Sequence, residues 1–326
     1  MTLPRRTLLA ATLAAPAVMP RGARAQGPWA PDRPVRLIVP FAPGGSQDVL
    51  GRLFAQQVSQ QVGQNVVVEN RAGAGGIIGA QEVARATPDG LTLLLTTAGQ
   101  TTIAKAIGRR LTYDPVADFT PIIHLSDSPV ALVTAPSLPP RDLQELLAYC
   151  RDARDPIPYG STGIGTNTHL IMEELKARER LKVEHVPYRG AAAAFNDLAA
   201  GRIGLMFISV ASVMAVSGAQ MKVIGVTSRE RFPPTPDVPT MIEGGLPGFE
   251  ASIWTGLAGP KGLPAPIVAR WNAEFARALQ SELVTSRLPA LGSTANGAGA
   301  EAFGTLLRED LDRWTRVAAP LNIQLE

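Results

Sequence analysis

Three short segments rich in glycine and small side chains are the best candidates for binding chemistry in this sequence. They are residues 41–46 (FAPGGS), 159–166 (YGSTGIGT) and 188–192 (YRGAA), and each lies between a predicted strand and a predicted helix. Glycine permits close backbone approach, and a helix start presents unpaired N–H groups with a partial positive charge. Such loops favour an anion without requiring a cationic side chain. An ordinary tight turn has the same composition, so the pattern alone leaves both interpretations open.

Nucleotide-binding and hydrolase motifs are incomplete in this sequence. Two G-x-G patterns lack their third glycine, no glycine-rich loop ends in Gly-Lys-Ser or Gly-Lys-Thr, and residues 159–163 lack the first glycine of a nucleophile elbow. An exported serine esterase would need Ser161 or Ser46 as its nucleophile. His169 or His185 would be its base, but no Asp or Glu is placed in sequence to orient either histidine. We therefore expect no catalytic residue and keep the esterase as the alternative.

Four more side chains near these loops have two interpretations each. Asp48 lies in the first turn of a predicted helix, where it either interacts with the helix dipole, or orients the glycine loop or accepts a hydrogen bond from a ligand donor or water. Arg71 and Arg189 flank the loops and either have solvated or structural ion-pair roles or contact a ligand carboxylate. Trp254 either walls a cleft or belongs to the core.

Alternating strands and helices position the candidate loops. The first unit has predicted elements at 35–39, 46–62, 66–69, 77–86 and 91–96, with Ser46 as N-cap and Gly63 at the end of its first helix. The second unit has them at 130–134, 143–151, 157–159, 166–176, 183–186, 191–200, 203–207 and 223–226. Short connections predict right-handed crossovers and an α/β fold with parallel sheets covered by helices. We expect a junction near residues 125–129, and tail helices at 268–279 and 301–317 that pack back on the first unit.

The first 25 residues have the features of an export signal. Arg5 and Arg6 precede an apolar stretch, and Ala23-Arg24-Ala25 precedes a predicted cleavage at Gln26. The segment also resembles a twin-arginine signal, and its apolar run is too short to span a bilayer. It holds four arginines and no acid, so 27 of the 31 basic residues remain in the mature chain against 28 acidic ones. We therefore expect a periplasmic protein with no electrostatic case for nucleic-acid binding.

Composition excludes several classes of protein. The chain has 326 residues, 45% of them hydrophobic and 18% charged, which suits a buried core and not global disorder. Its single cysteine, Cys150, excludes an intrachain disulfide and a cysteine-built zinc site, and we expect the thiol to be buried. Three histidines argue against a histidine-rich metal centre. We expect neither a metal nor a cofactor.

Seven segments, in order along the chain, resemble the solute receptors of tripartite tricarboxylate transporters, the Bug family of periplasmic binding proteins. They are residues 33–48 (RPVRLIVPFAPGGSQD), 68–76 (VENRAGAGG), 88–90 (PDG), 159–165 (YGSTGIG), 185–190 (HVPYRG), 236–240 (PDVPT) and 254–256 (WTG). The resemblance implies a type II periplasmic-binding-protein fold with two lobes, each a mostly parallel sheet flanked by helices, joined by two crossing strands. It places residues 26–126 and 231–326 in lobe 1 and residues 127–230 in lobe 2.

The resemblance also implies a ligand and a partner. A small carboxylate would be held in the cleft by backbone amides and small hydroxyls and delivered to a membrane permease by a monomeric receptor. Carried over by position, the implied ligand-binding residues are Phe41, Gly44, Gly45, Ser46, Asp48, Thr97, Ala98, Ser161, Thr162, Gly165, Thr166, Gly190 and Ala191. Ile208 and Ser209 depart from the family pattern, where many relatives carry a polar residue. A sensory receptor that contacts a signalling protein would need the same closure, so the sequence does not separate uptake from sensing.

Overall fold

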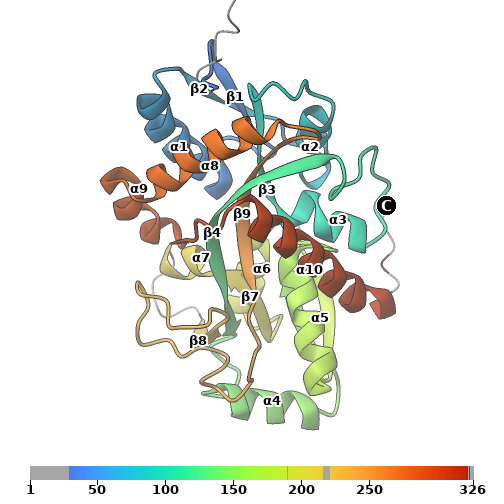
Figure 1. Ribbon diagram of the computed structural model, residues 1–326. Helices are drawn as coiled ribbons and strands as arrows, with labels where there is room; N and C mark the ends of the chain where they lie inside the picture. Colours follow the sequence, from blue (N-terminus) through green and yellow to red (C-terminus); the bar gives the residue numbers. More distant parts are fainter. Residues whose placement is uncertain (1–28, 189, 216–220, 322, 324–326) are drawn as a thin grey trace, which may run out of the picture.

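A ten-stranded mixed sheet runs through the molecule in the order β2-β1-β3-β9-β4-β7-β5-β6, with β8 and β10 each paired to β4. The computed structural model describes residues 29–188, 190–215, 221–321 and 323 (Figure 1). The predicted export signal at 1–25 and its cleavage site lie outside these residues. The two halves of the sheet, each with its own helices, form two lobes, and β4 passes through both.

The first lobe is built on three parallel strands: β1 (Val35–Val39), β2 (Val66–Asn70) and β3 (Thr92–Thr97). Helices α1 (Ser46–Val62) and α2 (Ile77–Ala84) pack against these strands. Four of the five residues of β1 are buried, as expected for a strand in a sheet that helices cover. The helix α1 ends at Gly63, as predicted, where φ is +70°. Its N-cap is Gly45, so the N-cap prediction for Ser46 was wrong by one residue.

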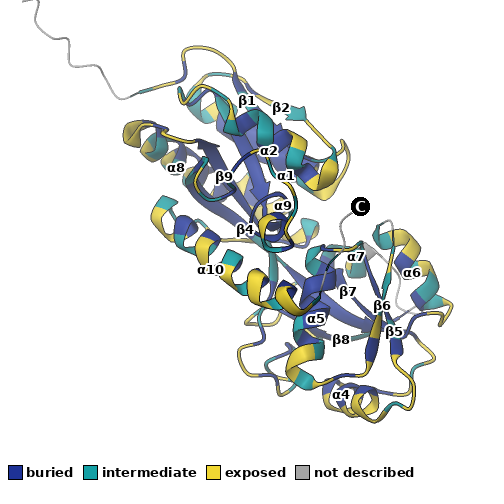
Figure 2. Cartoon of the chain, turned by 90° about the vertical axis from the view of Figure 1, so that its right-hand side faces the viewer, coloured by how far each residue is buried: buried dark blue, intermediate teal, exposed yellow. Residues whose placement is uncertain are grey.

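The second lobe repeats this plan with β5 (Ile157–Ser161), β6 (Val183–Pro187) and β7 (Leu205–Ser209), which are parallel to one another. Its helices are α4 (Leu143–Asp152), α5 (Asn167–Glu179), α6 (Ala191–Ala199) and the short α7 (Val210–Ala215). Cys150 lies on the buried face of α4, as predicted. Figure 2 shows the strands of both lobes buried and the outer faces of the helices exposed.

Two antiparallel strands connect the lobes and were only partly predicted. Strand β4 (Phe119–Thr134) pairs with β9 (Ser252–Pro260) along its first part and with β7 and β8 (Lys222–Val226) at its end. The expected junction at 125–129 lies inside β4, because the strand begins well before residue 130. The pairing of β4 with β9 shifts between Pro121 and Ile123 and again between His124 and Ser126. At each of these points β4 has one residue more than β9.

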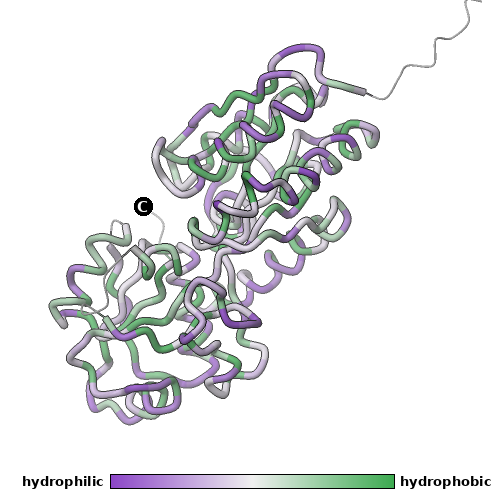
Figure 3. The backbone as a smooth tube through the Cα atoms, turned by 90° about the vertical axis from the view of Figure 1, so that its left-hand side faces the viewer, coloured by the Kyte–Doolittle hydropathy of each residue, from purple (hydrophilic) through white to green (hydrophobic). Residues whose placement is uncertain are grey.

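The C-terminal part of the chain returns to the first lobe. Helices α8 (Ala265–Leu279) and α9 (Glu282–Arg287) pack on α1, as expected for the tail. Helix α10 (Ala300–Ala318) contacts the short α3 (Thr102–Ala106), β4 and α5, so it touches both lobes. The two-residue strand β10 (Thr294–Ala295) adds to the edge of β4. In Figure 3 the hydrophobic segments follow the sheet and the inward faces of these helices.

The segment between β8 and β9 packs on the second lobe. Phe232 joins the apolar cluster that contains Val226, while Met241, Leu246 and Phe249 join the cluster under α4 and α5. All four residues come later in the chain than residue 230, where the resemblance implies that lobe 2 ends. In the structure the chain therefore leaves the second lobe only where β9 begins.

Candidate ligand-binding cleft

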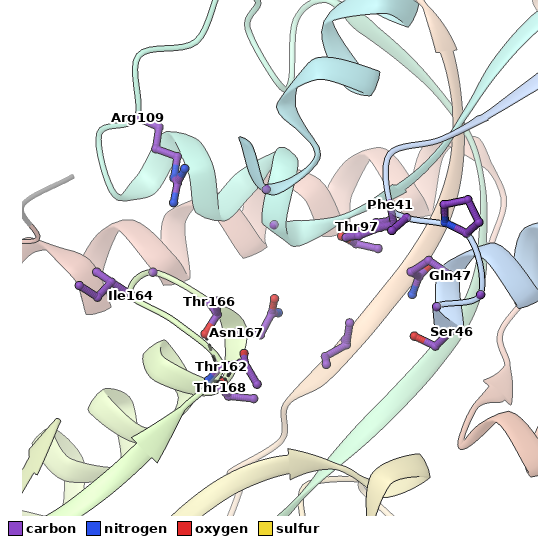
Figure 4. A pocket seen from close by; sticks show the side chains of 18 residues that line it. Phe41, Ser46, Gln47, Thr97, Arg109, Thr162, Ile164, Thr166, Asn167 and Thr168 are labelled. Atoms are coloured by element: carbon purple, nitrogen blue, oxygen red, sulfur yellow. Dashed lines mark hydrogen bonds between the residues drawn. The ribbon is translucent and has the colours of Figure 1, made fainter. Parts of the chain in front are cut away.

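A cavity of about 740 Å³ opens between the two lobes (Figure 4). This volume is within the range of small-molecule sites. The first lobe and β9 contribute Phe41, Ala42, Pro43, Gly44, Gly45, Ser46, Gln47, Gly75, Thr97, Gly99, Arg109 and Ile253. The second lobe contributes Thr162, Ile164, Gly165, Thr166, Asn167 and Thr168. Two of the three predicted loops therefore meet in one cavity.

The first-lobe loop is held in place by a buried carboxylate beneath it. Asp48 is only 3% exposed, and its Oδ2 accepts the N–H of Gly44 at 2.9 Å and the Nε–H of Arg52 at 3.0 Å. Its Oδ1 accepts the Nδ2–H of Asn70 at 2.9 Å. The hydrogen bond from Arg52 is the main cause that lowers the pKa of Asp48 to about 2. Of the two roles predicted for Asp48, the geometry matches orientation of the glycine loop.

The second-lobe loop ends at the N-terminus of α5. Thr166 is the N-cap, and its hydroxyl donates to the carbonyl of Gly163 at 2.8 Å. The hydroxyl of Thr168 accepts the N–H of Thr162 at 3.1 Å. Glycines with positive φ at 163 and 165 allow the chain to turn within this short loop. The first N–H groups of α5, which lack partners within the helix, therefore lie at the cavity wall.

Ser161 and two histidines lie behind this loop and not in the cavity. The Oγ of Ser161 is 2.7 Å from the Nε2 of His185, whose ring stacks on His169 with 3.9 Å between centroids. Burial lowers the pKa of each histidine to about 4. Ser161 is fully buried and is absent from the described cavity lining, so the structure does not place it where the resemblance implied.

Four other implied contacts also lie outside the described cavity lining: Asp48, Ala98, Gly190 and Ala191. Ala98 is buried just beyond the end of β3. Gly190 is the N-cap of α6, Ala191 is its first residue, and α6 follows β6, one of the two edge strands of the sheet. None of the described residues of the third predicted loop lines the cavity, although Gly75, which follows the other edge strand β2, does. Arg189 lies outside the described residues.

The remaining ambiguous side chains have structural roles. Arg71 pairs with Glu69 and Glu82, each at 3.0 Å, which is the ion-pair interpretation. Trp254 is buried, and its indole N–H donates to Asp310 at 3.1 Å, which is the core interpretation.

Ten lining residues are not among the implied contacts, although Ala42, Pro43 and Ile164 belong to the predicted loops. Ala42, Pro43, Gln47, Ile164, Asn167 and Thr168 adjoin predicted contacts, whereas Gly75, Gly99, Arg109 and Ile253 come from other segments. Gln47 could have been found from its position one residue after Ser46, at the helix start; its side chain lies 3.2 Å from the hydroxyl of Thr255. Arg109 follows the short helix α3, and no recognisable sequence motif includes it.

The electrostatic character of the cavity follows from its lining. Arg109 is the one charged side chain among the described lining residues, and no carboxylate of that set faces the cavity. The N-termini of α1 and α5 add partial positive charge from opposite lobes. Together these groups favour an anion, and the hydroxyls of Ser46, Thr97, Thr162 and Thr166 supply further hydrogen bonds.

The described residues provide neither a membrane-spanning helix nor a cluster of metal ligands. None of the helices in that part of the chain is both long and apolar enough to cross a membrane. Over the same residues, no group of three histidine, cysteine or acidic side chains is arranged to hold a metal ion.

Comparison with known proteins identifies the family. The family model described as tripartite tricarboxylate transporter family receptor (TctC) matches residues 50–323. Protein BugT of Bordetella pertussis is 32% identical over 298 residues, which cover 91% of this chain and 91% of that protein. MatC of Rhodopseudomonas palustris, solved with bound malate, is 35% identical with a TM-score of 0.74, covering 88% of this chain and 99% of MatC.

A second R. palustris protein, solved with adipate, is 33% identical with a TM-score of 0.76, covering 89% of this chain and 97% of that one. These matches confirm the α/β fold class and the family resemblance drawn from the seven sequence segments. The chain belongs to the TctC family of tripartite tricarboxylate transporter receptors, which includes the Bug proteins.

Proposed function

We propose that this protein is a periplasmic receptor that captures a small carboxylate between its lobes and delivers it to the permease of a tripartite tricarboxylate transporter. One observation carries the proposal: the N-termini of α1 and α5, from opposite lobes, open into a single cavity whose described lining holds no acid. The malate and adipate in two solved relatives are carboxylates of the proposed class.

The proposed contacts are the implied residues that line the cavity. They are Phe41, Gly44, Gly45, Ser46 and Thr97 in the first lobe and Thr162, Gly165 and Thr166 in the second. Hydrogen bonds to a charged group contribute roughly 1.5–3 kcal/mol each, and a micromolar Kd needs about 8 kcal/mol in total. Five such bonds near the middle of this range exceed that value and leave a few kcal/mol to offset the cost of ordering and closure.

Closure would bring the two sets of donors onto one ligand. The lobes already touch beside the cavity, since a Cβ at Gly165 would lie 2.4 Å from the Cδ1 of Ile107 in the first lobe. A ligand that contacts both lobes binds the closed form more tightly and so increases its population. Hinge closure of two domains around a ligand is a motion that periplasmic binding proteins use, and bending at the crossing strands would produce it here. The closed form is then the shape that a permease would recognise.

We infer that the protein is not an enzyme. The serine esterase alternative requires Ser161 to meet a substrate, yet its hydroxyl is buried between Gly163 and His185 and outside the described cavity lining. Ser46 lies at the cavity wall, but no histidine is among the described lining residues.

The proposal is tested with the mature chain from Gln26 in a thermal-shift screen against carboxylates, followed by calorimetry. Binding to the folded state alone raises Tm with ligand concentration. We expect at least one small carboxylate to raise Tm, while neutral sugars and the amides of the same acids do not. Turnover of an activated ester that is lost in Ser161→Ala would contradict the receptor assignment, as would the absence of binding by every acid in the panel.

A further inference from the structure

Arg109 stands apart from the other groups in the cleft. It is the one charged side chain among the described lining residues, and it comes from the segment after α3 and not from any glycine-rich loop. Figure 4 shows Arg109 at one side of the cavity and Ser46 and Gln47 at the other, with Thr162, Thr166 and Asn167 between them. A ligand held at the helix N-termini therefore leaves Arg109 available to a second group.

The backbone at Arg109 is fixed by the way α3 ends. The N–H of Gly108 donates to the carbonyl of Lys105 at 3.0 Å, and the N–H of Arg109 donates to the carbonyl of Ala104 at 3.0 Å. This pair of bonds is a Schellman motif, with Gly108 in the required left-handed conformation at φ +73°. Arg109 is thus the residue just beyond the helix end, and its side chain starts from a defined direction at the rim of the cavity.

The charges around Arg109 leave its guanidinium without a carboxylate partner among the described residues. The nearby Lys105 pairs with Asp114 at 2.7 Å, and Asp114 also accepts the N–H groups of Val116 and Ala117. The acid closest in sequence is therefore already occupied. A guanidinium has five donors in a planar fork that matches a carboxylate, so an unpaired one at a cavity wall suits a bidentate contact with an anion.

We propose that Arg109 binds a second anionic group of the ligand, so that the cleft selects acids with a carboxylate at each end over acids with only one. The inference rests on the proposed function, in which the first carboxylate lies at the N-termini of α1 and α5. A charge-assisted bidentate contact adds affinity only for ligands long enough to reach from those helix ends to Arg109. Arg109 is then the residue that distinguishes diacids from monoacids.

The neighbouring Arg110 provides a matched control. It carries the same charge one residue further on, but it is exposed and lies outside the described cavity lining. Arg109→Gln and Arg110→Gln change the net charge equally, so any long-range attraction of an anion falls equally in both. A difference between the two variants therefore reports direct contact.

The experiment is calorimetry at neutral pH with succinate and adipate and with the monoacids of equal chain length, butyrate and hexanoate. We expect Arg109→Gln to weaken binding of the preferred diacid by at least about tenfold while its weak monoacid binding stays within about twofold. Arg110→Gln should leave both unchanged, and the Tm of each unliganded variant should match that of the wild type.

The outcomes separate this inference from the proposed function. If the wild type binds diacids and Arg109→Gln binds them equally well, Arg109 does not contact the second carboxylate of the ligand. The proposed receptor function would still stand. Equal weakening of monoacid and diacid binding in Arg109→Gln also overturns the inference, because Arg109 would then contact the first carboxylate. If the wild type binds none of the four acids and no other carboxylate in the panel, both proposals fail.

Discussion

The Nδ1 of His169 accepts the backbone N–H of Gly165 at 3.1 Å, so a ring in the helix α5 holds the loop that faces the cleft. This bond requires a neutral imidazole with its proton on Nε2, because a protonated ring has no acceptor. The adjacent His185 stacks on the same ring, and Tyr159 stacks on His185. The loop geometry is thereby tied to the charge state of two buried histidines, with Glu173 and Lys176 as the charged groups that influence His185.

Stability should fall as the pH drops from about 6.5 to about 4. Burial lowers the folded-state pKa of His169 from 6.5 to about 4, so in this window the unfolded chain binds more protons than the folded one. The loss for one histidine is at most about 3 kcal/mol. Urea unfolding between pH 7.5 and 4.5 measures it, and His169→Gln, which keeps an acceptor but does not titrate, should show a flatter profile. An identical pH profile in the variant would contradict this assignment.

Asp48→Ala should weaken ligand binding although Asp48 is outside the described cavity lining. The substitution leaves the N–H of Gly44 and the amide of Asn70 without their acceptor, which costs about 1–3 kcal/mol of stability. Urea unfolding and calorimetry give the two effects. Arg52→Gln is the control, because it removes the exposed ion-pair partner and keeps the carboxylate under the loop, so its losses should be smaller. Equal losses in both variants would show that the ion pair, and not the loop contact, matters.

Gly45→Val should abolish or strongly weaken binding while the fold stays intact. Gly45 has an extended backbone that valine adopts readily, and its Cβ would meet only the carbonyl of Ala42 at 3.5 Å. The added side chain would occupy the cavity next to the α1 N-terminus. Gly299→Val is a matched control, since Gly299 is also an extended helix N-cap, with its nearest contact at 3.5 Å, and lies outside the described cavity lining. Calorimetry should show normal affinity for the Gly299 variant only.

Gly165→Ala should hold the lobes apart. The left-handed φ of +70° costs about 1–2 kcal/mol for alanine, and the new Cβ would meet the Cδ1 of Ile107 at 2.4 Å. Ile107→Val removes that atom at a cost of about 0.5–1.5 kcal/mol. We expect small-angle scattering to show a more open molecule and calorimetry a weaker affinity in Gly165→Ala, with both partly restored in the double variant. Failure of Ile107→Val to restore either would locate the effect in the backbone alone.

The sequence predicted the parallel units well because each strand and helix carries its own local pattern. Gly63 ends α1, and the buried side of α4 contains Cys150, as its leucine spacing indicates. The crossing strands were harder to predict, since Pro121 lies within β4 and glycines lie within β9. Gly256 does not form a turn. Its lack of a side chain leaves room for the ring of Phe303, which would lie 2.1 Å from a Cβ at this position.

The site was predictable to the extent that it is made of loops beside helix starts. The loops at residues 41–46 and 159–166 follow β1 and β5, the inner strands of the two parallel sets, whereas Gly190 follows the edge strand β6. Strand order is a long-range property and leaves no local trace in the sequence. Arg109 reaches the cavity from a helix end, where neither composition nor spacing indicates a ligand contact.

The path of the chain through β4 and β9 also governs the order in which the nascent protein can fold. The partner strand shared by β3 and β4 is β9, which is synthesised only after the whole second lobe. A chain interrupted before residue 252 would expose two unpaired strand edges, which are templates for aggregation. The first half of the chain therefore completes its strand pairing only after β9 has been made, when α8, α9 and α10 are still to follow.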